Sequence, residues 1–337
     1  LACFGFSDVI LDNVVFTYNV GDLGGGLISI ACNLNITNSE FNTNAAIYGG
    51  GIYATDGIFS LSSTLFQSNY AETVGGGAVF GESNISSSLT ASDLEFFDNE
   101  SDFGAGLNLQ ILTANVSSST FEGNAGALGG GLNVLGANFT GDDLLFQNNS
   151  ASNFGGGVAI GAEESSQSTV SVLRNSTIQN NSAPGGGGII YLEGQNTLEN
   201  SQLLNNSATG FGGALFVGDE YDDTLTYTSN HLEMIDTIIE GNSANYGGGM
   251  YLRFEASAHC SSSLNTVGGF HNNTASTFGG AAHLTNDVVF TGESCDLGLS
   301  STENSPNDIS IELTNTIGDY NYADNATFTC DGTGCNP

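Results

Sequence analysis

The chain has 337 residues but no lysine and no tryptophan, and its only arginines are Arg174 and Arg253. Its 36 acidic residues therefore have almost no cationic counterparts, and the formal net charge is -34. Because proteins that bind nucleic acid hold the phosphates with clustered cations, the sequence excludes this function. The charge also disfavours anionic membrane surfaces and acidic polysaccharides as partners. We expect the acids mainly to solvate the surface, with adaptation to a saline or divalent-rich setting as the alternative.

Signals for membrane insertion and for catalysis are missing as well. No apolar run reaches the roughly 18 residues of a membrane-spanning helix. At Leu1 there is no basic segment followed by an apolar one, so we expect any signal peptide to be already removed or to lie outside this segment. The GxSxG, HExxH and GxGxxG patterns are absent, and so is a phosphate loop ending in GK. We therefore expect neither enzymatic activity nor a cofactor.

Glycine is abundant, with 48 residues, and much of it belongs to one repeated unit. The unit is clearest at residues 121–131, FEGNAGALGGG: a large apolar residue, Asn three places later, and a glycine cluster beyond it. Ten copies begin at Phe16, Phe41, Phe66, Phe96, Phe121, Phe146, Ile178, Leu203, Ile239 and Phe270. The commonest spacing between them is 25 residues, with occasional insertions. A fixed period of this length predicts a solenoid.

The segments after the glycines alternate apolar and other residues with a period of two, as in Leu132 and Val134. This period indicates a strand with one buried face, whereas no stretch keeps a helical period without interruption. Equivalent strands from successive coils would stack in parallel about 4.8 Å apart, and like residues would form columns. The sequence therefore predicts an all-β, right-handed parallel β-helix of about ten coils over residues 1–313, followed by a cap over residues 314–337. A column of repeat asparagines, from Asn19 to Asn273, should donate hydrogen bonds from coil to coil.

The paired signatures, FxxN and then GGA or GGG with an aliphatic residue, resemble the repeats of the chlamydial polymorphic outer membrane protein family. Residues 41–52 (FNTNAAIYGGGI) and 270–284 carry the resemblance best, and it extends over about residues 12–313. Similar repeats occur in surface proteins of other microbes and algae. The resemblance implies a right-handed parallel β-helix displayed on a cell surface. The sequence has no segment typical of an outer-membrane barrel, so we do not expect export through one.

Six cysteines lie near the two ends of the chain and form no CxxC pair. This favours disulfides over zinc, and hence an oxidising compartment. Aligning Ala2-Cys3 with Ala31-Cys32 predicts a bridge between Cys3 and Cys32 at the start of adjacent coils, with free buried thiols as the alternative. Cys260 and Cys295 precede comparable segments and are expected to join two late coils. Cys330 and Cys335 could close a small ring around a glycine-rich turn.

One outward column of the strands after the glycines is apolar and lacks acids, which is unexpected in so acidic a chain. Because contiguous exposed apolar surface usually marks an interface, we predict contact there with another subunit or with another part of a longer chain. The alternative is that inserted loops fold over this face. Neither outward column contains Asp or Glu, so the paired carboxylates of a polysaccharide-cleaving enzyme are missing from it. The predicted interface residues are Ile28, Tyr53, Val79, Ile190, Phe216 and Tyr251.

Eleven Asn-x-Ser/Thr sequons mark predicted N-glycosylation sites. Random placement would give about 7 or 8, so the count is weak evidence and the positions matter more. Four of the asparagines immediately precede a repeat Asn, which would place their side chains in an outward row along one edge. Alternatively, Asn simply suits this turn position. The sequons are Asn35, Asn84, Asn99, Asn115, Asn138, Asn148, Asn175, Asn180, Asn205, Asn272 and Asn325.

Two features could suggest a metal ion. The insertion at residues 218–230 contains Asp219, Glu220, Asp222 and Asp223, which could bind calcium, but calcium-loop patterns are missing and a solvated loop is the simpler interpretation. Histidines at 259, 271 and 283 are spaced by about half a coil, so they should project from different faces. We predict no metal site.

The sequence thus predicts an extracellular structural or adhesive surface glycoprotein, a rigid β-helical subunit of a cell-surface filament or coat. We expect self-association or other surface and filament proteins as partners, N-linked glycans, and no insertion of this segment into a membrane. A polysaccharide-binding or polysaccharide-cleaving β-helix module is the alternative.

Overall fold

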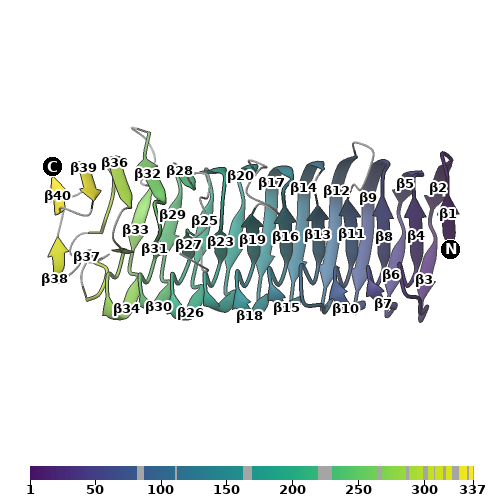
Figure 1. Cartoon of the computed structure of the whole chain (residues 1–337), viewed down its shortest axis with the longest axis horizontal. Helices are drawn as coiled ribbons and strands as arrows, with labels where there is room; N and C mark the ends of the chain where they lie inside the picture. The colour runs from purple at the N-terminus through teal and green to yellow at the C-terminus, as the bar shows by residue number, and fades with distance from the viewer. Residues whose placement is uncertain are drawn as a thin grey trace.

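The backbone winds repeatedly around one axis and forms a long rod (Figure 1). This computed structural model describes residues 1–81, 87–110, 112–161, 169–218, 230–263, 268–285, 288–298, 303–306, 308–313, 316–320, 326–331 and 334–336. All regular elements within these ranges are β-strands. Most circuits of the chain contribute strands to three sheets, which we call A, B and C. The fold is therefore a parallel β-helix, which confirms the sequence prediction.

Sheet A contains the strands that follow the glycine clusters. With β1 before these ten strands and β37 after them, twelve strands pair in parallel and in chain order, which gives eleven circuits along the described part of the rod. The strands are β1 (Ala2–Phe4), β4 (Leu27–Ile30), β8 (Ile52–Thr55), β11 (Ala78–Gly81), β13 (Leu107–Gln110), β16 (Leu132–Leu135), β19 (Val158–Gly161), β23 (Ile189–Tyr191), β27 (Leu215–Val217), β31 (Met250–Leu252), β35 (Ala282–Leu284) and β37 (Ile309–Leu313).

Sheet B covers two sides of each coil and bends at a corner between them. Its strands are β2 (Asp8–Asp12), β3 (Val15–Thr17), β5 (Asn33–Thr37), β6 (Glu40–Asn42), β9 (Ile58–Gln67), β12 (Ser88–Phe97), β14 (Thr113–Glu122), β17 (Asn138–Gln147), β20 (Val170–Arg174), β21 (Thr177–Gln179), β24 (Gln195–Glu199), β25 (Gln202–Leu204), β28 (His231–Ile235), β29 (Ile238–Glu240), β32 (Ser257–Ser261), β33 (Gly269–His271) and β36 (Val289–Cys295).

Sheet C is shorter and lies between sheet B and the glycine turns. Its strands are β7 (Ala45–Tyr48), β10 (Tyr70–Val74), β15 (Ala125–Leu128), β18 (Ser150–Phe154), β22 (Ser182–Gly185), β26 (Ser207–Phe211), β30 (Ser243–Tyr246) and β34 (Thr274–Phe278). The chain then reverses direction sharply, and Gly129, with φ of +62°, adopts the left-handed conformation that this turn requires.

The interior is a column of large apolar side chains, as the repeat predicts, and its first six members are stacked phenylalanine rings. Phe121 lies between Phe96 and Phe146, with ring centroids 4.8 and 4.6 Å away and nearly parallel planes. All three rings are fully buried. The stack begins at Phe16 and continues through Phe41 and Phe66. Because each ring covers its neighbours, the apolar core runs along the rod without widening.

The asparagine column is a continuous hydrogen-bond ladder. The backbone N–H and the Nδ2 of Asn124 both donate to Oδ1 of Asn149, each at 3.0 Å, and Nδ2 also donates to the carbonyl of Phe96 at 2.9 Å. Asn124 Oδ1 in turn accepts from Asn99. The same pattern links Asn19 at one end to Asn304 at the other. Asn304 extends the ladder by one member beyond the ten that the repeat identified.

One disulfide joins the first two coils and another joins two of the last coils, and both pairings agree with the prediction. Cys3 bonds to Cys32 and Cys260 bonds to Cys295. The predicted alignment was wrong for the first pair, because Cys3 lies opposite Ser29 in the parallel register, three residues before Cys32. The second bridge has the same offset, because Cys260 lies opposite Gly292, three residues before Cys295 at the end of β36. Two disulfides indicate an oxidising environment.

The parallel stack ends with β37, so the predicted boundary after residue 313 falls between β37 and β38. Beyond it, β38 (Thr316–Tyr320) pairs antiparallel with β37, and β39 (Ala326–Asp331) pairs antiparallel with β36. The last strand, β40 (Gly334–Asn336), forms a hairpin with β39 that places Cys330 and Cys335 opposite each other. The side chain of Cys335 lies outside the described part, so the ring between them stays a prediction.

Candidate functional site

The predicted interface is buried inside the chain, which corrects the sequence prediction. Val79, Ile190, Phe216 and Tyr251 have exposed fractions of 2, 0, 1 and 5%. Burial also raises the pKa of Tyr251 to about 12. Only Ile28 and Tyr53, at the N-terminal end, remain partly exposed. The apolar column therefore offers little surface to another subunit.

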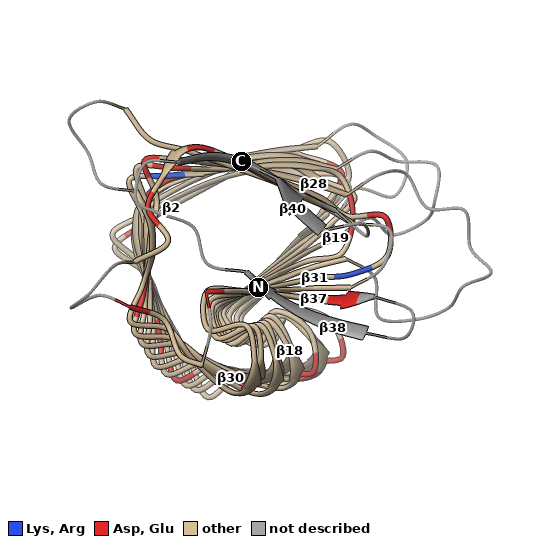
Figure 2. Cartoon of the chain, turned by 90° about the vertical axis from the view of Figure 1, so that its left-hand side faces the viewer, with Lys and Arg blue, Asp and Glu red and all other residues tan. Residues whose placement is uncertain are grey.

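The reason is a second core between sheets A and C. Ala159, Ile190, Phe216 and Tyr251 pack against Leu128, Phe154, Leu192, Phe211 and Tyr246, most of which come from the ends of sheet C strands. Figure 2 shows how sheet C curls under sheet A in the cross-section. The two-residue period identified both faces of sheet A correctly. It could not show that the chain folds back over the second face.

The predicted glycosylation sites differ in their exposure to solvent. Asn35, Asn115, Asn138, Asn148, Asn175, Asn180, Asn205 and Asn272 are exposed. The prediction for Asn99 is wrong, because this residue belongs to the asparagine ladder and is 1% exposed, with Nδ2 donating to both Phe66 and Asn124. A glycan on Nδ2 would remove these bonds. Asn84 and Asn325, like the acidic residues at 219–223, lie outside the described residues.

The four asparagines in the row along one edge share a backbone conformation. Asn148, Asn180, Asn205 and Asn272 have φ between 53 and 57°, in the left-handed region that Asn tolerates better than most residues. This geometry explains Asn at these turns without glycosylation. It also leaves the side chains exposed, so both interpretations of the row stay open.

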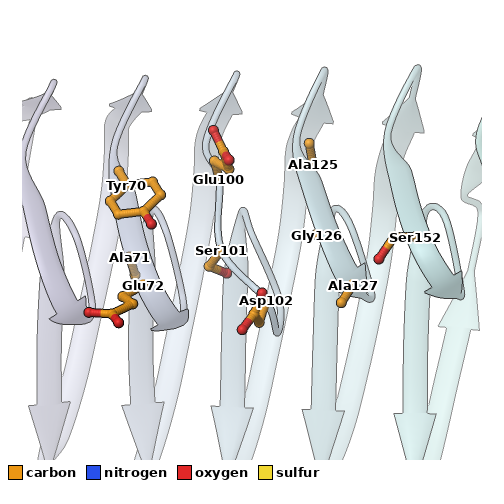
Figure 3. A pocket seen from close by; sticks show the side chains of 10 residues that line it. All are labelled: Tyr70, Ala71, Glu72, Glu100, Ser101, Asp102, Ala125, Gly126, Ala127 and Ser152. Carbon is orange, nitrogen blue, oxygen red and sulfur yellow. The ribbon is translucent and has the colours of Figure 1, made fainter.

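A groove with a volume of about 210 Å³ lies on the outer side of sheet C (Figure 3). It forms where the sheet is interrupted: residues 100–103 make only isolated bridges to their neighbours, and the adjacent coil contributes the small residues Ala125, Gly126 and Ala127. Tyr70, Glu72, Glu100 and Asp102 line it. An aromatic ring beside three carboxylates suits a cation or a sugar, but an acidic groove alone does not identify a ligand.

A second hollow, of about 470 Å³, lies at the corner of sheet B. Its lining includes Glu40, Asp93 and Glu95 among Ser, Thr and Asn side chains. Within the described ranges, no group of three or more His, Cys, Asp or Glu has the arrangement of a metal site. Both hollows are acidic surface features, and each is bordered by three carboxylates.

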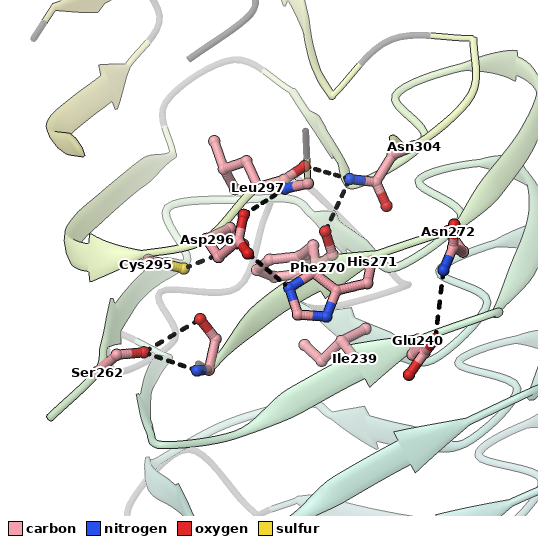
Figure 4. Close-up of polar contacts among 12 residues, drawn as sticks. Ile239, Glu240, Ser262, Phe270, His271, Asn272, Cys295, Asp296, Leu297 and Asn304 are labelled. Carbon is pink, nitrogen blue, oxygen red and sulfur yellow. Dashed lines mark hydrogen bonds and ion pairs between the residues drawn. The ribbon is translucent and has the colours of Figure 1, made fainter. Parts of the chain in front are cut away.

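All four histidines lie in the last coils, each near a carboxylate. Nε2 of His271 lies 3.1 Å from Oδ2 of Asp296 (Figure 4), and His283 lies 3.7 Å from Glu312. Glu233 lies between two histidines: His231, two residues earlier on the same strand, at 3.6 Å, and His259 on the neighbouring strand, at 3.8 Å. The pairs of His259, His271 and His283 connect successive coils. The three histidines of the prediction, His259, His271 and His283, pair with three different carboxylates.

The first half of sheet B presents a polar face that the repeat pattern did not predict. The outward positions of β5, β9, β12, β14 and β17 in this half are in register from coil to coil. We call them the polar face: Asn33, Asn35, Thr37, Ile58, Ser60, Ser62, Ser88, Thr90, Ser92, Thr113, Asn115, Ser117, Asn138, Thr140 and Asp142. The alternation of short polar residues in these strands could have identified it.

No protein-family model, no curated protein and no solved structure matches the chain. The similarity to polymorphic outer membrane protein repeats therefore stays a resemblance. Of the residues described, none belongs to a helix that is long and apolar enough to cross a membrane.

Proposed function

We propose that this chain is an extracellular structural or adhesive surface glycoprotein, a rigid β-helical subunit of a cell-surface filament or coat. The observation that carries this proposal is the unbroken interior. The asparagine ladder connects each coil to the next, and the phenylalanine stack connects the first six repeats. One disulfide stabilises each end of the rod. Such a rod resists bending because any bend must break ladder bonds.

Charge and glycans fit the same role. The acidic positions lie around the outside of the cross-section in Figure 2, where they keep rods apart in solution. We expect N-glycans on the exposed row formed by Asn148, Asn180, Asn205 and Asn272. Mass spectrometry of the protein from its natural source would test this expectation, with the buried Asn99 expected to be unmodified.

Electron microscopy of the native material tests the structural role. We expect ordered fibres or a coat built from rods about 50 Å long, since eleven circuits are spaced about 4.8 Å apart. Dispersed particles without any assembly would contradict the proposal.

The groove beside Tyr70 keeps polysaccharide cleavage as a second candidate, because it places Glu72, Glu100 and Asp102 around one hollow. Cleavage needs an acid and a base on opposite sides of the scissile bond. Release of reducing sugar that is lost in Glu100→Gln, but kept in a variant outside the groove such as Glu240→Gln, would support it.

A further inference from the structure

The polar face differs in composition from the rest of the chain. Thirteen of its fifteen residues are Ser, Thr or Asn, whereas the 38 Asn and 67 Ser or Thr of the whole chain would supply about five at random. The exceptions are Ile58 and Asp142. Charged residues lie at its two ends, where Asp8 and Asp12 precede it and Asp142 pairs with Arg174 at 3.1 Å. In a chain of net charge -34, about four coils of this side are therefore uncharged.

The middle column of the face is free to bind. It consists of Asn35, Ser60, Thr90, Asn115 and Thr140, which lie opposite one another in successive strands. In the part of the chain that the structure describes, these five side chains make no hydrogen bond to protein, whereas Asn33 and Thr37 beside them donate to Asp8 and Asp12. Hydroxyl and amide groups both donate and accept hydrogen bonds.

The face is also rigid. The residues between the outward positions point inward, and Phe59, Leu89 and Ala114 are at most 1% exposed. Donors and acceptors are therefore fixed about 4.8 Å apart along the rod and about 6.6 Å apart across it. Binding to such an array costs little conformational entropy, because its donors and acceptors are already ordered.

We propose that the polar face binds an uncharged, extended polysaccharide that lies along the rod axis. This deepens the proposed surface role, on which it rests, by naming the partner. Sugar hydroxyls supply the matching donors and acceptors. A neutral chain is favoured for two reasons. An acidic polysaccharide would be repelled by the net negative charge of the protein, and a cationic one would bind to the acidic residues outside the polar face. Each contact is weak, so binding requires a polymer that engages several coils at once.

The alternation of polar residues on this face also explains its sequons. On an outward strand face, Asn and Ser/Thr at alternate positions produce Asn-x-Ser/Thr automatically, as at Asn35 with Thr37 and Asn115 with Ser117. We therefore expect these asparagines to be unglycosylated, since a covalent glycan would cover the array. The row beginning at Asn148 lies at a different corner and is unaffected.

Co-sedimentation of the full chain with amorphous cellulose and with chitin tests the proposal, with soluble cellotriose as competitor. We expect binding to at least one of these polymers, and no competition by millimolar cellotriose. The variant Ser60→Glu/Asn115→Asp should bind at least fivefold less. The control Gln67→Glu/Gln202→Glu makes the same change in charge on the second half of sheet B and should bind like the wild type, with thermal melting showing that both variants fold.

Three results would overturn the proposal: no binding to either polymer, equal loss in both variants, or N-glycans on Asn35 or Asn115 in the native protein. None of them would decide the outcome of electron microscopy of the native material, which tests the structural role, so the two proposals can fail separately.

Discussion

The amide of Asn304 donates to the carboxylate of Asp308 at 3.3 Å, at the point where the asparagine ladder ends. Asp308 is 4% exposed, and its burial raises the pKa of its carboxyl to about 6. Its backbone carbonyl accepts from Ala281 and Ala282 of the preceding coil. At the end of the ladder, Oδ1 of Asp308 thus accepts a bond from Asn304 Nδ2. In the middle of the rod, the corresponding acceptor is Oδ1 of the next ladder Asn.

This pKa predicts a pH dependence for the C-terminal coils. A carboxyl whose pKa is higher in the folded state binds its proton more tightly there, so its contribution to stability is complete below about pH 4 and is lost as the pH rises through about 6. Asp308→Asn should remove this dependence and stabilise these coils at neutral pH by about 1–2 kcal/mol, allowing for partial contact with water. Hydrogen exchange of β35 and β37 in both proteins from pH 4 to 7.5 measures it. Equal pH profiles would contradict the prediction.

The ladder predicts a large effect for one buried amide. Asn124→Ala removes the acceptor for the backbone N–H of Asn99 and the donor to Phe96, which leaves buried polar groups unpaired. We expect a loss of about 2–4 kcal/mol, seen as a lower melting temperature and faster exchange in the coils on both sides. Asn115→Ala, in the same coil but exposed, is the matched control and should change stability by less than about 0.5 kcal/mol.

The ring stack predicts a dependence on position. Phe121→Ala leaves a cavity between two rings and should cost about 3–5 kcal/mol. Phe16→Ala should cost less, because Phe16 stacks on Phe41 alone and is only partly buried. Comparison of the two melting curves checks the order. If the end substitution is the more damaging, the stack does not stabilise the rod in the way proposed.

The bridge between Cys260 and Cys295 closes a loop with a sequence separation of 35 residues. Its removal in Cys260→Ser/Cys295→Ser should destabilise the last coils by about 3–4 kcal/mol through the added freedom of the unfolded chain. Limited proteolysis should then cut after about residue 250 while the earlier coils stay intact. The variant Cys3→Ser/Cys32→Ser is the control, and it should move the first cuts to the other end.

Residues that recur at a fixed period were placed correctly from the sequence. Phe121 and Asn124 were assigned to the interior and the ladder because a period of 25 residues puts each residue next to its own copies. Both described disulfides were paired because each joins two adjacent coils. The register of Cys3 was wrong by three residues, since alignment of two short segments does not include the turn between them. Asn304 escaped notice because Ser301, three places before it, is not a large apolar residue and no glycine cluster follows it.

The sequence by itself therefore determined the winding of the chain: which residues face inward, and which lie above one another. Only the tertiary structure decided which outward faces meet water. Ile190 and Phe216 face away from the main core, yet sheet C covers them, whereas Ser60 and Thr90 face away from it and stay exposed. A two-residue period encodes the side of a strand, but what lies across from that side depends on the curvature of the whole coil.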